Sequence, residues 1–405
     1  MPTRALGLFL AFLWAWAGAD MVRAVPAPAY TESALTRDPL LRARSAIGEA
    51  RPLALDLFLG RPGAEAALAR WVRTHPGAAS DDRAGAWLLL CEERQRRTRY
   101  GAALEACRRA EALSPGSTGN FIGLLAPLRD LPPLRWDRGR LEVPLIRDGE
   151  GTRRVWVSRG PARVEGVVDS GAEVAIVMAS VAARLGARPL RSSRPPSIGT
   201  PTTPVAGSPA VIDRLEIGGA HLLNLPVIVL PDAQLTFADG STLPLVLSLP
   251  ALTAAGKAAF LRHGSVLALG NAVPALRAAP VQLYWDPMGV GFEAAFAHGR
   301  RAVHLDTGSV RTYLYPTAAS SLGPNEAATR QPFDRSIAGL GGERREHAFR
   351  YAGVTLGVGG QLWRVAPMEM APADDGGAAA RIGAGIMDRF ETIVLDFRQM
   401  RMRVR

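Results

Sequence analysis

Reactive and metal-binding side chains are scarce in this chain of 405 residues. It has two cysteines, Cys91 and Cys107, and six histidines, without a Cys-x-x-Cys motif and without any cluster of cysteine and histidine. A zinc site needs about four such ligands close together, so we predict neither a zinc site nor a cysteine–histidine nucleophilic site. We expect no metal and no other cofactor.

Lysine is nearly absent as well. Lys257 is the only one, so the formal net charge of +11 comes almost entirely from arginine. The arginines are scattered along the chain rather than grouped in a stripe with interleaved aromatic residues, as nucleic-acid-binding surfaces are. The charge therefore indicates no nucleic-acid partner, and attraction to anionic membranes or cell-wall polymers is a less specific alternative.

The sequence has one long apolar run, which lies at its start. A single arginine precedes residues 5–19, which are almost entirely apolar and end in small residues. This pattern is typical of a secretory signal peptide, with cleavage after Ala19 or Ala24. The alternative, a membrane anchor, needs about 20 apolar residues to span a bilayer. We therefore predict a signal peptide at residues 1–24, a periplasmic or secreted protein, and no stable membrane insertion after cleavage.

Residues 33–125 are predicted to be helical, and residues 84–115 resemble a tetratricopeptide helical hairpin. The hairpin pattern is matched at Trp87, Leu90, Ala103, Ala110 and Pro115. One hairpin is fewer than the roughly three repeats that such arrays need, so a small helical cap on the following domain is the alternative. A protein partner that docks on this helical region is a further expectation.

The two cysteines replace the usual glycine and aromatic residue of the hairpin pattern. Cys91 and Cys107 fall on the facing sides of its two helices. In an oxidising compartment they could form a disulfide, and the alternative is a pair of small buried side chains. The sequence leaves both alternatives open.

The pattern changes after residues 126–140, a segment that we predict to be a linker because it contains three prolines. Short runs of Val, Ile, Leu and aromatic residues then alternate with Gly, Pro and Ser, which is typical of many short strands. Prolines near residues 272–280 divide this part in two. We therefore predict one lobe at residues 141–275 and another at residues 280–405.

Each predicted lobe contains an aspartate directly after an apolar, strand-like stretch. The strings are Val-Val-Asp-Ser-Gly-Ala at 167–172 and His-Leu-Asp-Thr-Gly-Ser at 304–309. One Asp-Ser/Thr-Gly is a common turn and a weak signal. Two of them, 137 residues apart and in matching surroundings, indicate a duplicated unit that brings Asp169 and Asp306 together.

The residues after the two motifs match in type and order. A short apolar stretch and a short helix follow each motif, and Gly186 and Gly323 are expected to end those helices. Further along, each half has a hairpin pattern with a Gly-Gly turn, at residues 218–219 and 359–360. The duplicated unit is therefore a whole lobe.

Two carboxylates held within hydrogen-bonding distance share one proton over a wide pH range. The charged oxygen accepts a proton from a water molecule between them while the protonated partner polarises a carbonyl group, so that the water attacks without a covalent enzyme intermediate. Gly171 and Gly308 allow sharp turns beside these carboxylates. Ser170 and Thr307 are expected to hydrogen-bond across the lobe interface and to hold the two loops.

In these motifs residues 141–405 resemble the aspartic proteases of the pepsin and retropepsin clan, as two retropepsin-like units fused in tandem in the manner of bacterial aspartyl protease family proteins. In this clan each lobe also has an apolar-apolar-glycine motif behind the catalytic loop. The string Arg381-Ile-Gly fits that motif with Gly383 as its glycine, whereas the first lobe has Ser248 at that position. The resemblance implies a mainly β, two-lobed pepsin/retropepsin-type fold, in addition to the N-terminal helical, tetratricopeptide-like region.

The resemblance also implies a flap, a hairpin that folds over the cleft and excludes water. The candidate segments are residues 197–207 and 337–343, because both are rich in small residues, as a mobile tip requires. The candidate flap residues are Gly199, Thr200, Gly339 and Gly341. The alternative is that both segments are ordinary exposed loops, and neither contains a tyrosine of the pepsin type.

The function that the resemblance implies is an exported aspartic endopeptidase that hydrolyses polypeptides, with Asp169 and Asp306 as its catalytic residues. One alternative is a peptide-binding or cell-wall-binding module that has the same fold without catalysis, since a fold does not dictate an activity. Another is a structural or adaptor protein centred on the helical region, which the low repeat count argues against.

Overall fold

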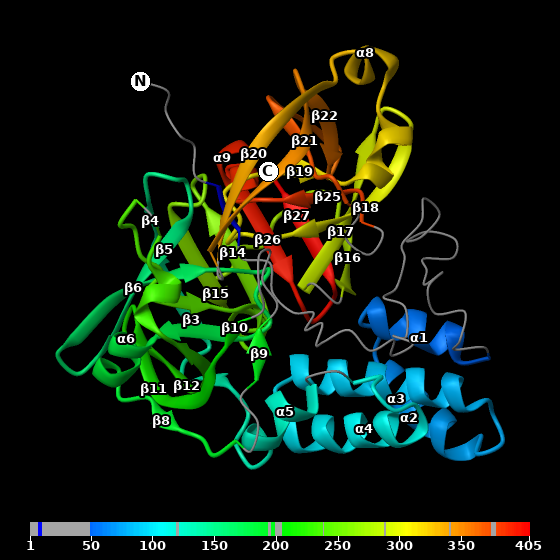
Figure 1. The fold of residues 1–405 in the computed structure, drawn as a ribbon, viewed down its shortest axis with the longest axis vertical. Coiled ribbons are helices and arrows are strands. Elements are labelled where there is room, and N and C mark those ends of the chain that lie inside the picture. Colours follow the sequence, from blue (N-terminus) through cyan, green and yellow to red (C-terminus); the bar gives the residue numbers. More distant parts are fainter. Residues whose placement is uncertain are drawn as a thin grey trace.

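The computed structural model describes residues 7–9, 49–118, 121–192, 196–198, 205–237, 239–286, 289–339, 342–373 and 378–405. Figure 1 shows three parts: a helical unit in blue and cyan, a first β lobe in green, and a second β lobe in yellow to red. The predicted mainly β, two-lobed fold with an N-terminal helical region is therefore confirmed. Most of the predicted signal peptide lies outside the described residues.

The helical unit contains the hairpin predicted from the sequence. Its helices are α1 (Arg51–Phe58), α2 (Ala64–Thr74), α3 (Ser80–Arg96), α4 (Tyr100–Leu113), α5 (Phe121–Leu125) and the 3-10 helix η2 (Ala126–Leu128). Helices α3 and α4 lie side by side and are joined by a short turn at residues 97–99 (Figure 1). Residues 84–93 of α3 are all buried, so this helix is covered on every side and lies inside the unit. Its tetratricopeptide character stays a prediction.

A disulfide joins the two long helices of this unit. The Sγ atoms of Cys91 in α3 and Cys107 in α4 are bonded, with their Cα atoms 5.2 Å apart. Both side chains are fully buried. Of the two alternatives that the sequence left open, the structure contains the bonded one.

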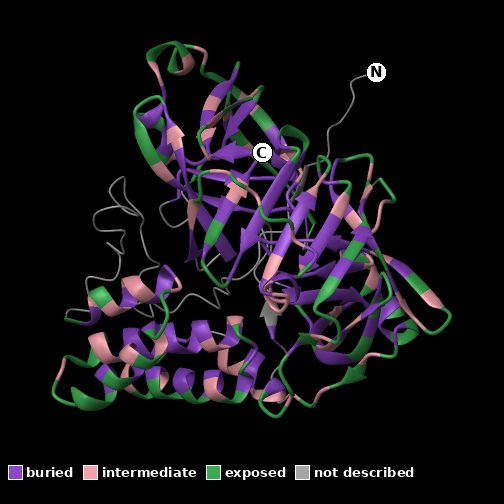
Figure 2. Ribbon diagram, turned by 180° about the vertical axis from the view of Figure 1, so that it is seen from behind, coloured by how far each residue is buried: buried purple, intermediate pink, exposed green. Residues whose placement is uncertain are grey.

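The first lobe is a closed sheet. Its strands run in the order β2-β12-β7-β13-β6-β5-β11-β8, and an additional pairing between β11 and β12 closes the sheet on itself. The strands are β2 (Arg135–Trp136), β4 (Ile146–Arg147), β5 (Arg153–Arg159), β6 (Ala162–Val168), β7 (Ala175–Met178), β8 (Arg188–Pro189), β11 (Ser208–Ile217), β12 (Ala220–Leu230) and β13 (Leu245–Leu247). Three short helices are α6 (Ala179–Arg184), η3 (Asp232–Leu235) and α7 (Leu249–Thr253). Closure buries the apolar inner faces of the strands (Figure 2).

The second lobe repeats the central strands of the first. In both lobes a short strand pairs in parallel with the strand before the aspartate and antiparallel with the strand after it. The strands are β17 (Gly289–Phe296), β18 (Gly299–Leu305), β19 (Tyr313–Leu314), β20 (Gln331–Gly339), β21 (Gly342–Tyr351), β22 (Val354–Val358), β23 (Gln361–Val365), β24 (Met368–Met370) and β25 (Ala380–Ile382). The helices are η4 (Pro316–Ser321), α8 (Pro324–Ala327) and α9 (Gly385–Arg389), and a short strand β1 (Gly7–Phe9) pairs in parallel with β20.

A sheet of six strands connects the two lobes. Its order is β3-β15-β14-β26-β27-β16, and β14 and β26 pair antiparallel at its centre. Each half contributes three strands: β3 (Arg140–Pro144), β14 (Lys257–Leu261) and β15 (Val266–Gly270) from one, β16 (Val281–Asp286), β26 (Thr392–Asp396) and β27 (Arg401–Val404) from the other. This order is symmetric about its centre, so the duplication extends into the connection between the lobes.

The paired Gly-Gly turns are confirmed. Gly218 and Gly219 connect β11 to β12, and Gly359 and Gly360 connect β22 to β23, all four with positive φ. Tight hairpins favour this conformation because it matches the twist of the strands, and glycine adopts it without steric cost.

The parallel between the two helix-ending glycines is wrong. Gly186 has a φ of +59° after α6, as a glycine that ends a helix does. Gly323 instead has an extended conformation and caps the start of α8, where its N–H donates a hydrogen bond to Oε2 of Glu326 at 3.0 Å. The proline that follows Gly323 is the physical reason, since proline favours the first turn of a helix.

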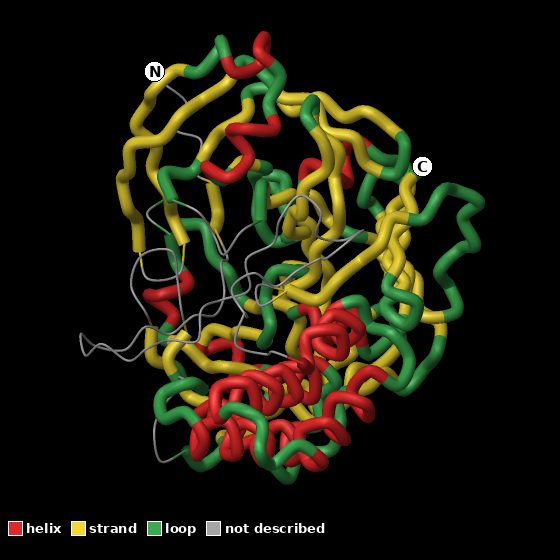
Figure 3. Tube along the Cα trace, turned by 90° about the vertical axis from the view of Figure 1, so that its right-hand side faces the viewer, coloured by secondary structure: helices red, strands yellow, loops and turns green. Residues whose placement is uncertain are grey.

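The segment predicted to be a linker, residues 126–140, contributes a strand to the first lobe. Strand β2 pairs antiparallel with β12. The Nε1 atom of Trp136 donates a hydrogen bond to the carbonyl oxygen of Ala251 at 2.9 Å. The three prolines therefore interrupt regular structure without detaching the segment, which connects the helical unit to the first lobe. Figure 3 shows the helices packed against the strands of the β part.

None of the helices in the described parts of the chain is long and apolar enough to cross a membrane.

The disulfide predicts a measurable share of the stability of the helical unit. We expect the double variant C91A/C107A to be about 3 kcal/mol less stable, because the bond closes a loop with a sequence separation of 16. Thermal unfolding with and without a reductant would measure the difference. The double variant is its own control, since a reductant should leave its unfolding unchanged; equal stability of the two proteins would contradict the prediction.

Candidate active site

Both aspartates stand at the end of a central strand, Asp169 after β6 and Asp306 after β18. The N–H of Asp169 donates to the carbonyl oxygen of Leu247, and the N–H of Asp306 to that of Ile382, each at 2.9 Å. These two acceptors are the last residues of β13 and β25, so each aspartate is fixed by the same strand of its own lobe. The repeated motif therefore has the same backbone geometry twice.

The hydroxyl residues next to the aspartates bind across the lobe interface, as the sequence predicted. The Oγ of Ser170 donates to the carbonyl oxygen of Leu305 at 2.8 Å and accepts from the N–H of Thr307 at 3.1 Å. In return the Oγ1 of Thr307 donates to the carbonyl oxygen of Val168 at 2.9 Å and accepts from the N–H of Ser170 at 3.0 Å. Four buried hydrogen bonds thus hold the two loops together.

The two glycines of the motif let the loops approach each other closely. A Cβ built on Gly171 would lie 2.5 Å from Cγ of Asp306, and one built on Gly308 would lie 2.3 Å from Cγ of Asp169. Each carboxylate therefore packs on the glycine of the opposite lobe, where no side chain fits. The same glycines donate their N–H groups to Oδ1 of their own aspartates, at 2.7 Å and 3.1 Å.

The two carboxylates are buried, with Asp169 0 % and Asp306 1 % exposed. Burial, followed by the negative charge of Asp306, raises the pKa of Asp169 well above the usual value of a carboxyl group. Within the described residues the Oδ2 atom of Asp169 has no hydrogen-bond partner. Asp169 therefore keeps its proton to higher pH than an ordinary carboxyl group does.

The apolar-apolar-glycine element lies behind each catalytic loop. Ala384 donates its N–H to the carbonyl oxygen of Ser309 at 2.7 Å, and Leu249 donates to that of Ala172 at 2.8 Å. Gly383 and Ser248, which precede these donors, thus hold the same position in the two lobes. A Cβ on Gly383 would lie 2.4 Å from the carbonyl oxygen of Arg311. Only the second lobe has this tight approach, so serine fits in the first.

Sequence reasoning missed one residue of the site, Arg381 on β25. Its Nη1 donates to Oδ2 of Asp306 at 2.7 Å, and its Nε donates to the hydroxyl oxygen of Tyr315 at 3.2 Å. The arginine side chain is 3 % exposed, so this is a buried ion pair. The available signal was an arginine at a position where the motif expects an apolar residue.

The predicted flap segments both form hairpins, and their tips lie outside the described residues. In the first lobe β9 (Ser197–Ile198) pairs antiparallel with β10 (Val205–Ala206), with Gly199 and Thr200 between them in the undescribed part. In the second lobe Gly339 ends β20 and pairs with Gly342, and Gly341 is not among the described residues. Hairpins at these two positions agree with the prediction, whereas their action as flaps stays a prediction.

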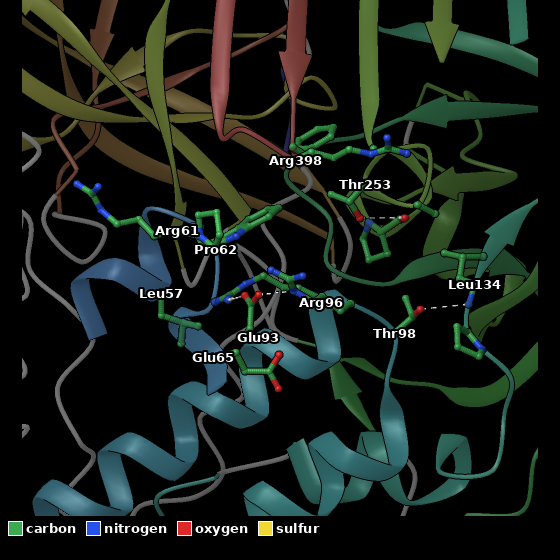
Figure 4. A pocket seen from close by; sticks show the side chains of 18 of the residues that line it. Leu57, Arg61, Pro62, Glu65, Glu93, Arg96, Thr98, Leu134, Thr253 and Arg398 are labelled. Atoms are coloured by element: carbon green, nitrogen blue, oxygen red, sulfur yellow. Dashed lines mark hydrogen bonds and ion pairs between the residues drawn. The ribbon is translucent and has the colours of Figure 1, made fainter. Parts of the chain in front are cut away.

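A large cavity of about 640 Å³ lies away from the two aspartates, between the helical unit and the β lobes. Figure 4 shows Leu57, Glu93 and Arg96 reaching it from the helices, and Thr253 and Arg398 reaching it from the lobes. The aromatic side chains of Trp285 and Phe397 also line it. It is a crevice between domains and is separate from the candidate active site.

The helical unit also reaches the back of the first catalytic loop. Gln95 and Arg96, at the end of α3, line a small cavity together with Glu173 and Leu249. Glu173 lies four residues after Asp169, and Leu249 follows Ser248. The helical unit therefore packs behind the loop that positions Asp169.

Within the described residues there is no group of three or more His, Cys, Asp or Glu side chains that could hold a metal ion.

The first lobe matches a known protein family. A family model described as an aspartyl protease matches residues 154–250, which include Asp169 and Ser248. Among solved structures, the chain is similar to the basic 7S globulin from soybean, with 14% identity over 65% of this chain and 94% of that chain and a TM-score of 0.43. The aspartic proteinase from Irpex lacteus is 13% identical over 65% of this chain and 96% of that chain, also with a TM-score of 0.43. No curated protein matches the chain.

The family match and the duplicated strand arrangement together define an aspartic protease-like fold. The match covers the first lobe alone, and the second lobe follows from the strand pairings that repeat those around Asp169. Residues 154–250 are thus similar to an aspartyl protease family domain, and the second aspartate comes from a second copy of the lobe.

The hydrogen bonds across the lobes predict a large effect of one hydroxyl. We expect Thr307→Val to destabilise the protein by about 1–3 kcal/mol, because the buried N–H of Ser170 loses its acceptor. Thr307→Ser is the matched control, since it keeps the hydroxyl and should remain within a fraction of that loss. Denaturant unfolding measures both, and equal stability of the two variants would contradict the assigned role of the hydroxyl.

The structure predicts that a side chain at position 383, behind the loop of Asp306, is tolerated less well than one at the equivalent position 248, behind the loop of Asp169. We expect Gly383→Ala to cost about 1–3 kcal/mol of stability, because its Cβ would overlap the backbone of Ser309 and Arg311. Ser248→Ala, the matched change in the first lobe, should cost much less because that position already accommodates a Cβ. Thermal unfolding measures both variants. An equal loss of stability in the two would contradict the expected difference in packing between positions 383 and 248.

Proposed function

We propose that this protein is an aspartic endopeptidase, in which Asp169 and Asp306 activate a water molecule for peptide-bond hydrolysis. The observation that carries the proposal is the pair of buried carboxylates, each packed on the glycine of the opposite lobe. The hydroxyls of Ser170 and Thr307 hold this pair in place. The aspartyl protease family match over the first lobe supports the same chemistry.

The reaction uses the difference in protonation between the two carboxylates. Asp306, in its charged form, accepts a proton from the water as the water oxygen attacks the peptide carbonyl carbon. Asp169, whose pKa is raised by burial, donates its proton to the carbonyl oxygen. As the C–N bond of the tetrahedral intermediate breaks, Asp306 passes its proton to the peptide nitrogen and a hydroxyl of the intermediate returns a proton to Asp169, so that the pair ends with the one proton it began with. No covalent bond to the enzyme forms.

The alternative is a module with the same fold that binds peptides or cell-wall strands without cutting them. The ion pair between Arg381 and Asp306 is the observation that favours it, because a buried guanidinium already occupies one oxygen of that carboxylate. Activity measurements separate the two functions.

The proposal predicts that each aspartate is required for cleavage. We expect Asp169→Asn and Asp306→Asn each to lower kcat/KM on an unfolded protein substrate by about 10²–10⁴-fold, since each change removes an acid or base from the reaction. Asp213→Asn, which alters an exposed partner of Arg188 on β11, is the matched control and should cleave normally. Cleavage by both active-site variants at the rate of the parent protein, or no cleavage by the parent at any acidic to neutral pH, would refute the protease function.

The raised pKa of Asp169 predicts the pH above which kcat/KM should fall. Activity requires Asp169 in its protonated form, so it should persist above the pH at which ordinary carboxyl groups have lost their protons and should fall as Asp169 deprotonates. Measuring kcat/KM from pH 3 to pH 9 tests this. A profile that falls on its alkaline side within the usual carboxyl range would contradict the assigned protonation.

Export and docking are further parts of the proposal. The signal-peptide pattern at residues 1–24 supports a periplasmic or secreted location, and so does the Cys91–Cys107 disulfide, because such bonds persist in oxidising compartments. A polypeptide is the proposed substrate, and the helical unit is the proposed contact region for a protein partner. Detection of the processed chain outside the cytoplasm would test the location.

A further inference from the structure

The two lobes share a backbone but differ in the side chains that flank their aspartates. Strand registers align Val246 of β13 with Arg381 of β25, since each is the residue before the last of its strand. The neighbours on the adjacent strands are Val167 and Ile176 in the first lobe and His304 and Tyr313 in the second. An apolar trio beside Asp169 thus corresponds to a polar, cationic trio beside Asp306.

Arg381 places a permanent positive charge against one aspartate. Its guanidinium is 2.7 Å from Oδ2 of Asp306 and is almost completely buried. Arginine stays protonated at all ordinary pH values, so a buried partner carboxylate provides the compensating charge. Asp306 accepts at its other oxygen from the N–H groups of Gly308 and Ser309. Asp306 therefore has donors on both oxygens, whereas Oδ2 of Asp169 has no donor among the described residues other than the partner aspartate when that group is protonated.

Other titratable groups face this pair from the neighbouring strands. The imidazole of His304 on β18 is buried and lies edge-on to the ring of Tyr315, 6.5 Å between centroids. The hydroxyls of Tyr313 and Tyr315 are 3.1 Å apart, and Tyr315 accepts from Arg381. Asp169 faces the pair from the first lobe.

Two more arginines lie on the same side of the second lobe and are paired with an acid. Arg311 and Arg335 both bind the carboxylate of Glu369 on β24. Arg335 also binds Glu346 on β21. Arg350 and Arg344 share these two carboxylates, so the cluster is positively charged overall. Arg381 differs from these arginines in that its guanidinium binds the active-site aspartate.

We propose that Arg381 is a positioning residue that keeps the negative charge of the aspartate pair on Asp306 and leaves the shared proton on Asp169. The proposal deepens the proposed protease function and rests on it. It assigns Asp306 as the base that accepts the proton of water and Asp169 as the acid that donates to the carbonyl oxygen. The repeated lobes alone would leave these two roles interchangeable.

The proposal predicts how the pH profile responds to the loss of this charge. Without the guanidinium the aspartate pair takes up its second proton at higher pH, so the acidic limb of kcat/KM should move upward in Arg381→Met. A shift of about 1–3 pH units is expected, the range typical of a carboxylate beside an arginine. Arg381→Lys keeps a positive charge and should move the limb much less. Arg300→Met on β18, which removes the partner of Glu293 on β17, is the matched control with an unchanged profile.

A second measurement does not depend on catalysis. In Asp169→Asn the only carboxyl group left in the pair is Asp306, and infrared difference spectroscopy of the carboxyl C=O stretch reports its protonation. We expect this group to take up a proton at higher pH in the double variant D169N/R381M than in D169N. The measurement stays informative even if the parent protein cuts no substrate, so failure of the protease function and failure of this proposal are distinguishable.

Two results would overturn the proposal. One is an acidic limb of folded Arg381→Met that coincides with that of the parent protein. The other is equal protonation of Asp306 in D169N and D169N/R381M. Thermal unfolding of each variant shows whether it is folded. If Arg381→Met does not fold, Arg381→Lys is compared with the parent protein instead. A pH profile with identical limbs and an unchanged rate then supports a charge role, and a loss of activity at all pH values refutes it.

Discussion

The exchange of hydrogen bonds between Ser170 and Thr307 is the contact on which the site depends. Each hydroxyl reaches from its own loop to the backbone of the other lobe, and each accepts an N–H in return. Buried polar groups are costly unless they are paired, so separation of the lobes would leave several donors and acceptors without partners. The free energy needed to break these hydrogen bonds opposes separation of the lobes, and so keeps the two carboxylates close together although two negative charges would repel each other.

The six-stranded sheet and these loops create a symmetric frame that contains an asymmetric site. Backbone positions repeat closely, down to the equivalent carbonyl acceptors of Asp169 and Asp306. The side chains around them do not repeat, because Arg381 replaces an apolar residue on one side only. Backbone symmetry brings two acids together, and the asymmetry of the side chains is the basis for the different protonation that we propose for them. A reaction that needs one acid and one base requires both features.

The helical unit is part of this arrangement rather than an appendage. The end of α3 packs behind the loop that holds Asp169. The segment that follows the helices adds strand β2 to the sheet of the first lobe, and its Trp136 donates a hydrogen bond to Ala251 in α7. The large crevice lies between this unit and the lobes. Any partner or ligand that moved the helices would therefore act on the side of the site that holds Asp169.

The sequence by itself determined the features that depend on local signals. The repeated aspartate motifs, the alternation of short strands and the Gly-Gly turns predict the lobes and the pair of aspartates, because turn chemistry and strand period act over a few residues. The tertiary structure alone decided the bond between Cys91 and Cys107, the strand within the predicted linker, and the ion pair of Arg381 with Asp306. The hairpin pattern named the cysteine pair but left its bonding open. The other two contacts join residues that are distant along the chain, and a local pattern contains no information on which distant side chain will meet it. Arg381 was visible as a departure from an apolar motif, but only the packing of β25 against β18 shows that its charge is directed at the aspartate.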